Sequence, residues 1–156
     1  MGEIAFSKET ETLVSAGVGS CLVITLYDPK LKFGAMAHAV LARSVYSIEL
    51  MAARKKDLKT ARYLLDTKYV QDAIDAMLVR MQDAGSRNSN IEAKLVGAAN
   101  MFSSLETGVG RESIDEAKKR LKEKGIKIVG ESVGGNMGRS VDFNPKSGIV
   151  TVSIKF

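Results

Sequence analysis

Three side chains near the start of the chain are of the types that carry out nucleophilic catalysis. Cys21 is the only cysteine, His38 is the only histidine, and Ser15 lies shortly before the cysteine. A thiol reacts as its thiolate, and a neighbouring imidazole favours that form by accepting the thiol proton. A hydroxyl on the other ring nitrogen fixes the imidazole tautomer, so these types together predict a nucleophile, a base and an orienting group.

The stretch "GVGSC" places two glycines directly before the thiol. Gly17 and Gly19 permit a sharp backbone turn at the mouth of a strand. Such a turn can present backbone N–H groups to the negative oxygen of a tetrahedral intermediate. We therefore expect an oxyanion site in the backbone around Gly19 and Ser20.

Each of these features also has a purely structural interpretation. A single cysteine is most often a small buried hydrophobe, and the histidine within "GAMAHAVL" is typical of a hydrogen-bonded core residue. Ser15 has the residue type of any strand hydroxyl, and "VGGNMGRS" at residues 133–140 is typical of a glycine-rich turn. Spacing alone leaves the catalytic and the structural interpretations open.

Other chemistries fit the sequence less well. A zinc site normally takes three or four nitrogen or sulfur ligands, more than one cysteine and one histidine supply. The chain also lacks a glycine-rich phosphate loop that ends in Lys-Ser or Lys-Thr. We expect no cofactor and no metal.

The hydrophobic pattern predicts strands first and helices later. Two strands at 21–27 and 35–41, joined by a turn at Asp28-Pro29, should pair antiparallel and bring Cys21 and His38 to one sheet face. Apolar residues at helical spacing predict a helix over 70–81, capped by Asp66 or Thr67 and ended by Gly85. Further strands are expected at "EIAFS", "TLVSAGV", "IEAKLVGAANMF" (interrupted at Gly97), "IKIVGESV", "RSVDF" and "IVTVSIKF", and a second helix at 110–124.

This order predicts an α+β fold in a single domain over residues 1–156. The expected architecture is a layered α/β sandwich with a mixed, largely antiparallel β-sheet and two to three helices. One cysteine excludes an intrachain disulfide and suits a reducing compartment. We find no signal-peptide pattern and no apolar run long enough to cross a bilayer, and so expect a cytoplasmic protein.

The positive charge is concentrated in one segment. The formal net charge is +5, and residues 43–68 hold seven basic and three acidic residues, which is +4 of that total. A nucleic-acid binder usually spreads its basic residues over a whole face, so we expect no nucleic acid partner. Pieces of residues 44–66 have a helical pattern but no sustained apolar stripe, so a lid or an excursion fits the segment as well as a helix does. Within this segment, Arg54, Lys55, Lys56 and Lys59 form either a docking patch for an acidic partner or a solvated face.

Several motifs in one order resemble the chemoreceptor glutamine deamidase family, CheD, over nearly the whole chain. They are "GVGSC", "GAMAH", "KYVQDAI", "AKLVGAANMF", "VGRESI", "LKEKGIKIVGESVGGNMGRSV" and "DFNPKSG". The resemblance implies a layered fold related to the catalytic domain of the cytotoxic necrotizing factor toxins. It also implies hydrolysis of glutamine side chains on methyl-accepting chemoreceptors to glutamate, and binding to a CheC-type phosphatase in some members.

By motif position, the resemblance makes Cys21 the nucleophile and His38 the base. The third family residue is commonly a threonine and falls on Ser15, which keeps the hydroxyl but lacks the methyl group that restricts a threonine rotamer. A second departure follows His38. Where the family usually continues through Leu-Pro into a polar loop, this chain reads Leu41-Ala42-Arg43.

Two other functions compete with the deamidase. The chain could act as a non-catalytic docking partner of a CheC-type phosphatase and of chemoreceptors, in which case it would tolerate the loss of Cys21. A thiol redox sensor would instead tolerate the loss of His38. The Cys–His spacing within the full set of motifs favours the enzyme.

Overall fold

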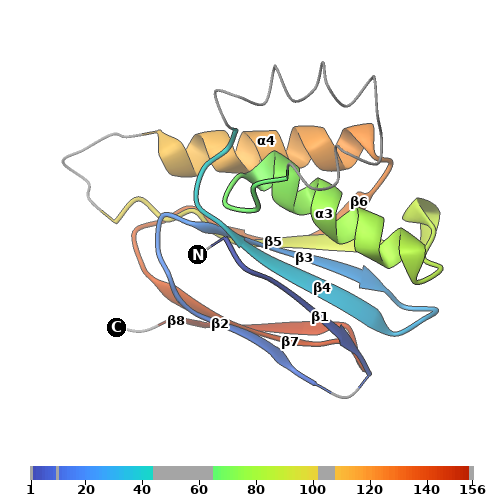
Figure 1. The fold of residues 1–156 in the computed structure, drawn as a ribbon. Helices are drawn as coiled ribbons and strands as arrows, with labels where there is room; N and C mark the ends of the chain where they lie inside the picture. Colours follow the sequence, from blue (N-terminus) through green and yellow to red (C-terminus); the bar gives the residue numbers. More distant parts are fainter. Residues whose placement is uncertain (1, 10, 44–64, 102–107, 155–156) are drawn as a thin grey trace.

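A computed structural model describes residues 2–9, 11–43, 65–101 and 108–154. Figure 1 shows three layers, with two helices above a large sheet and a smaller sheet below it. The large sheet has the strand order β1-β4-β3-β5-β6, in which β5 and β6 are parallel and the other neighbours antiparallel. Its strands are β1 (Ile4–Lys8), β3 (Leu22–Asp28), β4 (Phe33–Ala39), β5 (Glu92–Gly97) and β6 (Lys127–Val133).

The small sheet has the order β2-β7-β8 and is antiparallel throughout. Its strands are β2 (Leu13–Val18), β7 (Arg139–Asn144) and β8 (Ile149–Ile154). Strand β2 therefore pairs with a strand made more than a hundred residues later, rather than with its sequence neighbours β1 and β3. A turn joins the last two strands, and within it Gly148 at φ 75° donates its N–H to the Asn144 carbonyl at 2.8 Å.

Strand β3 is buried along its whole length because both of its faces are covered. Leu22, Ile24 and Leu26 belong to the larger apolar core beneath the helices. Val23 and Tyr27 alternate with them and belong to a smaller core between the two sheets. A side chain on β3 or β4 thus faces either the helices or the second sheet, and this choice decides where a reactive group lies.

The helices are α3 (Val70–Asp83) and α4 (Val109–Glu123), and a short 3-10 turn, η2 (Asn88–Asn90), precedes β5. Both pack on the same face of the large sheet, through residues such as Ile74, Met77 and Leu121. Arg120 of α4 donates from Nε to Asp75 Oδ1 of α3 at 2.8 Å and also donates from Nη2 to the other carboxylate oxygen, which ties the two helices together. The site described below lies on the other face of the sheet.

The structure confirms the predicted α+β class, the largely antiparallel mixed sheet and the antiparallel pairing of the strands at 21–27 and 35–41. The predicted cap of the first helix is wrong. Tyr69 is the N-cap and forms no side-chain cap, because the carbonyl of Leu41 accepts the N–H of Val70 at 2.8 Å. The Thr67 hydroxyl donates to the Gly2 carbonyl instead. Gly85 adopts φ 100° and ends the helix as expected.

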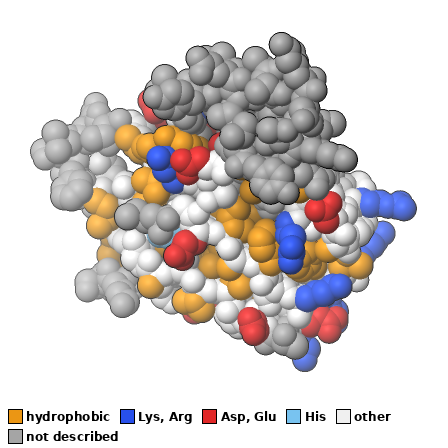
Figure 2. Space-filling view, viewed as in Figure 1, with side chains coloured by type: hydrophobic (Ala, Val, Ile, Leu, Met, Phe, Trp, Pro, Cys, Tyr) orange, Lys and Arg blue, Asp and Glu red, His pale blue; other side chains and the backbone are white. Residues whose placement is uncertain are grey.

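The segment predicted to be a lid or an excursion lies, from residue 44 to residue 64, outside the described residues. The basic residues Arg54, Lys55, Lys56 and Lys59 fall there, so their docking function stays a prediction. On the face in Figure 2, basic and acidic side chains intermingle among apolar ones. In the part of the chain that the structure describes, no helix is long and apolar enough to span a membrane.

Candidate active site

His38 lies near the end of β4 and faces the small sheet. In the register of the two strands it is opposite Val23, whose side chain belongs to the core between the sheets. The Ser15 hydroxyl of β2 approaches it from the other sheet, with Oγ 3.0 Å from His38 Nδ1. The hydrogen bond expected between Ser15 and His38 is therefore present, and it joins the two sheets.

The second ring nitrogen of His38, Nε2, is buried and forms no hydrogen bond with the described residues. A buried polar atom without a partner is costly and calls for an explanation, such as a bond formed only with a substrate or with a reacting group. When Nδ1–H donates the hydrogen bond to Ser15 Oγ, Nε2 is the unprotonated nitrogen and can act as a base.

Cys21 directly precedes β3 and is half-buried. Because successive side chains of an extended chain alternate, we expect Cys21 on the same sheet face as Val23, diagonal to His38. No hydrogen bond joins the thiol to the imidazole within the described residues. The structure thus brings Ser15 and His38 into direct contact and places Cys21 directly before the neighbouring strand β3.

A bulge in β2 carries the chain from Ser15 into the residues before the thiol. The pairing of β2 with β7 is irregular between Ser15 and Val18, and Gly17 within that interval has φ 67°. This left-handed conformation favours glycine and explains one of the two glycines of the motif. Gly19 does not have a positive φ; a Cβ there would instead lie 3.3 Å from Met101 Cγ.

The backbone at the thiol is fixed by the residues that follow β5. The Cys21 carbonyl accepts the N–H of Ala98 at 2.7 Å, and the Gly19 carbonyl accepts the N–H of Ala99 at 2.9 Å. A peptide unit is planar and trans, so the Ser20 N–H points away from the side on which the Gly19 carbonyl is bound. Among the described residues, no acceptor takes the N–H of Ser20 or Cys21. These donors are available to an oxyanion.

Gly97 allows this close approach. It adopts φ 109°, and a Cβ at this position would lie 2.5 Å from the Cys21 carbonyl oxygen and 2.6 Å from Val18 Cγ1. Ala98, the next residue, also has a positive φ of 53°. The end of β5 is thus shaped to hold the loop that carries the thiol.

Burial shifts the pKa values of both reactive groups toward their neutral forms. It raises the pKa of the Cys21 thiol above its ordinary value, because the charged thiolate is less well solvated there. It lowers the pKa of His38, and the nearby Glu3 carboxylate only partly opposes this effect. At neutral pH the site therefore rests as a thiol and a neutral imidazole, rather than as a preformed ion pair.

A cleft of about 1140 Å³ opens beside residues 19–21, here called the nucleophile loop because the sequence predicts Cys21 as the nucleophile. Ser20 lines it, as do Met101, the first turns of α4 including Arg111, and Gly134 directly after β6, whereas Cys21 and His38 do not.

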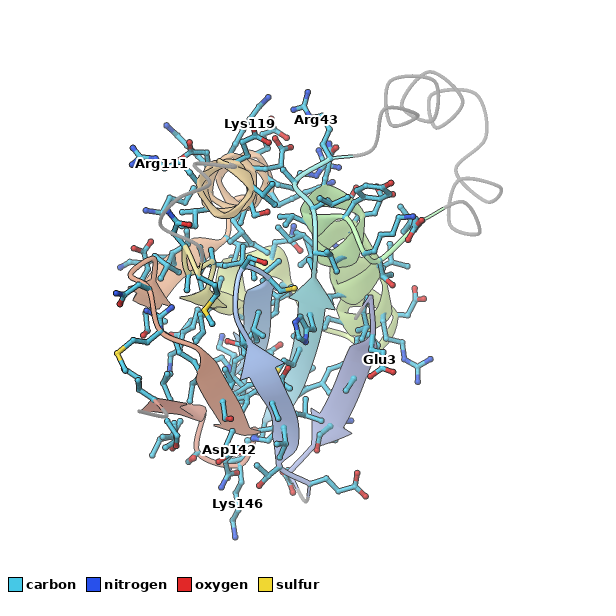
Figure 3. All side chains as sticks on the ribbon, turned by 90° about the vertical axis from the view of Figure 1, so that its left-hand side faces the viewer. Glu3, Arg43, Arg111, Lys119, Asp142 and Lys146 are labelled. Atoms are coloured by element: carbon cyan, nitrogen blue, oxygen red, sulfur yellow. The ribbon has the colours of Figure 1, made fainter. Side chains whose placement is uncertain are left out.

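Figure 3 shows Arg43, Arg111 and Lys119 at the helical side of the molecule and Asp142 and Lys146 at the opposite end. In the described part of the chain, no three His, Cys, Asp or Glu side chains group as metal ligands.

The sequence analysis did not identify the residues that hold the backbone on either side of Ser20. Gly97, Ala98 and Ala99 hold the nucleophile loop, and Arg139 donates to the carbonyls of Gly97 and Gly134. The stretch "VGGNMGRS" was the available signal, but glycine spacing alone does not reveal which distant backbone a loop will contact.

The fold and the site together define an α+β domain with a thiol, an imidazole and a hydroxyl at the seam between two sheets. The chain belongs to the CheD family. Its residues 50–154 match the family model described as "CheD chemotactic sensory transduction".

Curated relatives extend the match over the site residues as well. The chain is 34% identical to "Chemoreceptor glutamine deamidase CheD" of Thermotoga maritima, over 97% of this chain and 87% of that protein. It is 31% identical to the protein of the same name from Halalkalibacterium halodurans, over 94% of this chain and 86% of that protein. It is also 32% identical to "Probable chemoreceptor glutamine deamidase CheD 2" of Geobacter metallireducens, over 97% and 89% respectively.

Proposed function

We propose that this chain is a protein-glutamine deamidase of bacterial chemotaxis, which hydrolyses specific glutamine side chains of methyl-accepting chemoreceptors to glutamate and releases ammonia. The observation that carries this proposal is the Ser15–His38 hydrogen bond, which leaves His38 Nε2 buried and without a partner beside the strand that follows Cys21. The relatives named as chemoreceptor glutamine deamidases support the substrate.

In the first half of the reaction, Cys21 Sγ attacks the side-chain amide carbon of the glutamine. The thiol proton passes to His38 Nε2 as the S–C bond forms, which suits a pair that rests in its neutral forms. The backbone N–H groups of Ser20 and Cys21 stabilise the negative oxygen, and each such donor is typically worth about 3 to 4 kcal/mol. The protonated His38 then gives its proton to the leaving nitrogen, the C–N bond breaks, and ammonia departs from a thioester.

In the second half, neutral His38 takes a proton from a water molecule that attacks the thioester carbon. The same backbone donors hold the second oxyanion, the C–S bond breaks, and Cys21 regains its proton from His38. The product is glutamate on the receptor. Ser15 acts throughout by holding Nδ1, so that Nε2 remains the nitrogen that exchanges protons.

We also propose a cytoplasmic location and, as a second partner, a CheC-type phosphatase. The resemblance of the sequence motifs supports both, and the reducing environment suits the free thiol of Cys21. Co-purification of the chain with a CheC-type protein from the same cell tests the partner. Failure of purified components to form a complex would remove this partner from the proposal.

Mass spectrometry of a purified receptor cytoplasmic fragment tests the activity. We expect glutamine-to-glutamate conversion at defined positions with the parent protein, and none with Cys21→Ala or His38→Ala. The Arg120→Gln variant changes a side chain that ties the helices together and serves as a control for general damage. Conversion that persists in Cys21→Ala would contradict the assignment of the nucleophile.

A different result would favour the docking alternative. If neither the parent nor Cys21→Ala converts any glutamine, while both still bind the receptor fragment, the chain acts by binding. If binding is also absent, the proposed substrate is wrong.

A further inference from the structure

Arg139 is a buried cation whose charge is met by backbone carbonyls. It begins β7, lies opposite Val18 of β2, and is 9% exposed. Among the described residues no carboxylate pairs with it; its hydrogen bonds run to the carbonyls of Gly97 and Gly134. A buried charge costs free energy unless such partners compensate it, so these bonds restrain the backbone that they contact.

The guanidinium ties together the ends of β5 and β6. Its Nη1 donates to the Gly97 carbonyl at 2.9 Å, and its Nη2 donates to the Gly134 carbonyl at 2.7 Å. The Gly134 N–H donates to the same Gly97 carbonyl at 2.9 Å. The planar fork of an arginine can span two carbonyls at once, whereas a lysine ammonium offers a single point of charge.

The next residues along β5 reach the thiol directly. The N–H groups of Ala98 and Ala99, which follow Gly97, bind the carbonyls of Cys21 and Gly19. Only glycine fits at position 97, because the Cys21 carbonyl occupies the space that a Cβ would need. Arg139 thus binds the Gly97 carbonyl, and the two residues after Gly97 bind the carbonyls on either side of Ser20.

We propose that Arg139 is a positioning residue, which holds the end of β5 so that the backbone of the nucleophile loop is placed to bind the oxyanion. This inference rests on the proposed function, since it assigns a further residue to that same reaction. Arg139 acts through the peptide planes of residues 19–21 and does not touch the substrate. Its contribution therefore belongs to the transition state, where the oxyanion forms, rather than to binding of the receptor.

The matched test compares Arg139→Met and Arg139→Lys with Arg120→Gln. Arg120 is also a mostly buried arginine with two bonds to one partner, but it joins the helices on the other face of the sheet. We expect Arg139→Met to lower kcat by about a hundredfold at nearly unchanged KM. Arg139→Lys should retain more activity than Arg139→Met, and Arg120→Gln should keep the parental kcat per folded molecule.

Two further measurements separate positioning from simple loss of structure. Amide hydrogen exchange of Ala98 and Ala99 should become faster in Arg139→Met than in Arg120→Gln, because their acceptors lie in the released loop. The pH dependence of Cys21 alkylation should match that of the parent, since burial, and not the Arg139 charge, sets the thiol pKa. All rates are expressed per folded molecule, with the folded fraction of each variant taken from its chemical denaturation curve.

Three results would overturn the inference. They are a parental kcat in Arg139→Met, an equal loss of kcat in Arg120→Gln, and a shifted alkylation profile, which would make Arg139 an electrostatic activator of the thiol. The exchange measurement needs no substrate. If the parent converts no glutamine while Ala98 and Ala99 still lose protection in Arg139→Met, the proposed function has failed and the positioning contact stands.

Discussion

Ser15 and His38 belong to different sheets, and on the proposed function their hydrogen bond determines which imidazole nitrogen acts as the base. The short serine side chain reaches Nδ1 from the edge strand of the small sheet. Nothing else among the described residues binds the imidazole through its ring nitrogens. The orientation of His38 consequently depends on one hydroxyl.

The first prediction concerns that hydroxyl. Ser15→Ala should lower kcat by roughly tenfold, which corresponds to about 1.4 kcal/mol, the scale of one hydrogen bond. Ser15→Thr should restore most of the rate, because it keeps the oxygen and restricts its rotamer. The measurement is initial-rate kinetics on a receptor fragment. A Ser15→Ala enzyme with the parental kcat would show that the bond does not orient the base.

The second prediction concerns pH. The reaction needs neutral His38 to accept a proton and a protonated thiol to supply it. Because the pKa of His38 is lowered, we expect the acid limb of kcat/KM to lie below the ordinary range of an imidazole. Because the pKa of Cys21 is raised, we expect the alkaline limb to lie above the ordinary range of a thiol. The profile should be broad and bell-shaped. A preformed thiolate–imidazolium pair would instead show thiolate ultraviolet absorbance at neutral pH in the free enzyme.

At the scale of elements, the end of β5 is the least tolerant part of the site. We predict that Gly97→Ala inactivates the enzyme, because the added Cβ needs the space of the Cys21 carbonyl and the residue has φ 109°. Gly125→Ala is the control, since Gly125 also has a positive φ, of 69°, but a Cβ there meets nothing within 4 Å. Both should lose stability by about 1 kcal/mol or more in thermal unfolding. Only Gly97→Ala should lose turnover per folded molecule.

Local pattern predicted the elements well where neighbours in sequence are neighbours in space. The hairpin of β3 and β4 and the apolar face of α3 both follow from short-range periodicity. The predicted cap failed because a distant carbonyl, that of Leu41, completes the helix start. The side-chain partners of α4 are also distant in sequence, since Arg120 binds Asp75 of α3 and Glu116 binds Arg43.

The sequence predicted the residue types of the site but not the backbone contacts that hold them in place. Cys21, His38 and Ser15 stand out because the chain has one cysteine and one histidine and because motif positions mark them. Arg139 and Gly97 contact backbone atoms of other segments. Every residue has such backbone atoms, so these contacts produce no recognisable pattern of side chains in the sequence. The implied likeness to the necrotizing factor toxins stays a prediction.

At the scale of the whole molecule, the two apolar cores serve different ends. The core beneath the helices lies on the opposite face of the large sheet from His38. The core between the sheets contains Val23 and Val141, which pair with His38 and Ser15 in the strand register. Phe143 of β7 lies opposite Leu13 of β2, so it supports the strand that carries Ser15. Met77 of α3 is equally buried but belongs to the first core.

We therefore predict different outcomes for two large-to-small substitutions. Met77→Ala and Phe143→Ala should each reduce the free energy of unfolding by about 2 to 5 kcal/mol, as buried truncations of this size do. Phe143→Ala should also lower kcat per folded molecule, because β2 can then shift relative to His38. Chemical denaturation combined with active-site titration measures both quantities. Equal kcat values in the two variants would show that the inter-sheet core does not position the site.

The pairing of β2 with β7 has a consequence for the life of the chain on the ribosome. Strand β2 is made early, but its sheet partner follows more than a hundred residues later. Until β7 has emerged, Ser15 has no sheet to hold it against His38, and the arginine behind the nucleophile loop does not yet exist. A nascent polypeptide that ends before β7 contains Cys21 but lacks the strand that holds Ser15 in place. On the proposed function, we therefore expect catalytic activity only after β7 has been translated, and a product interrupted before β7 should be inactive.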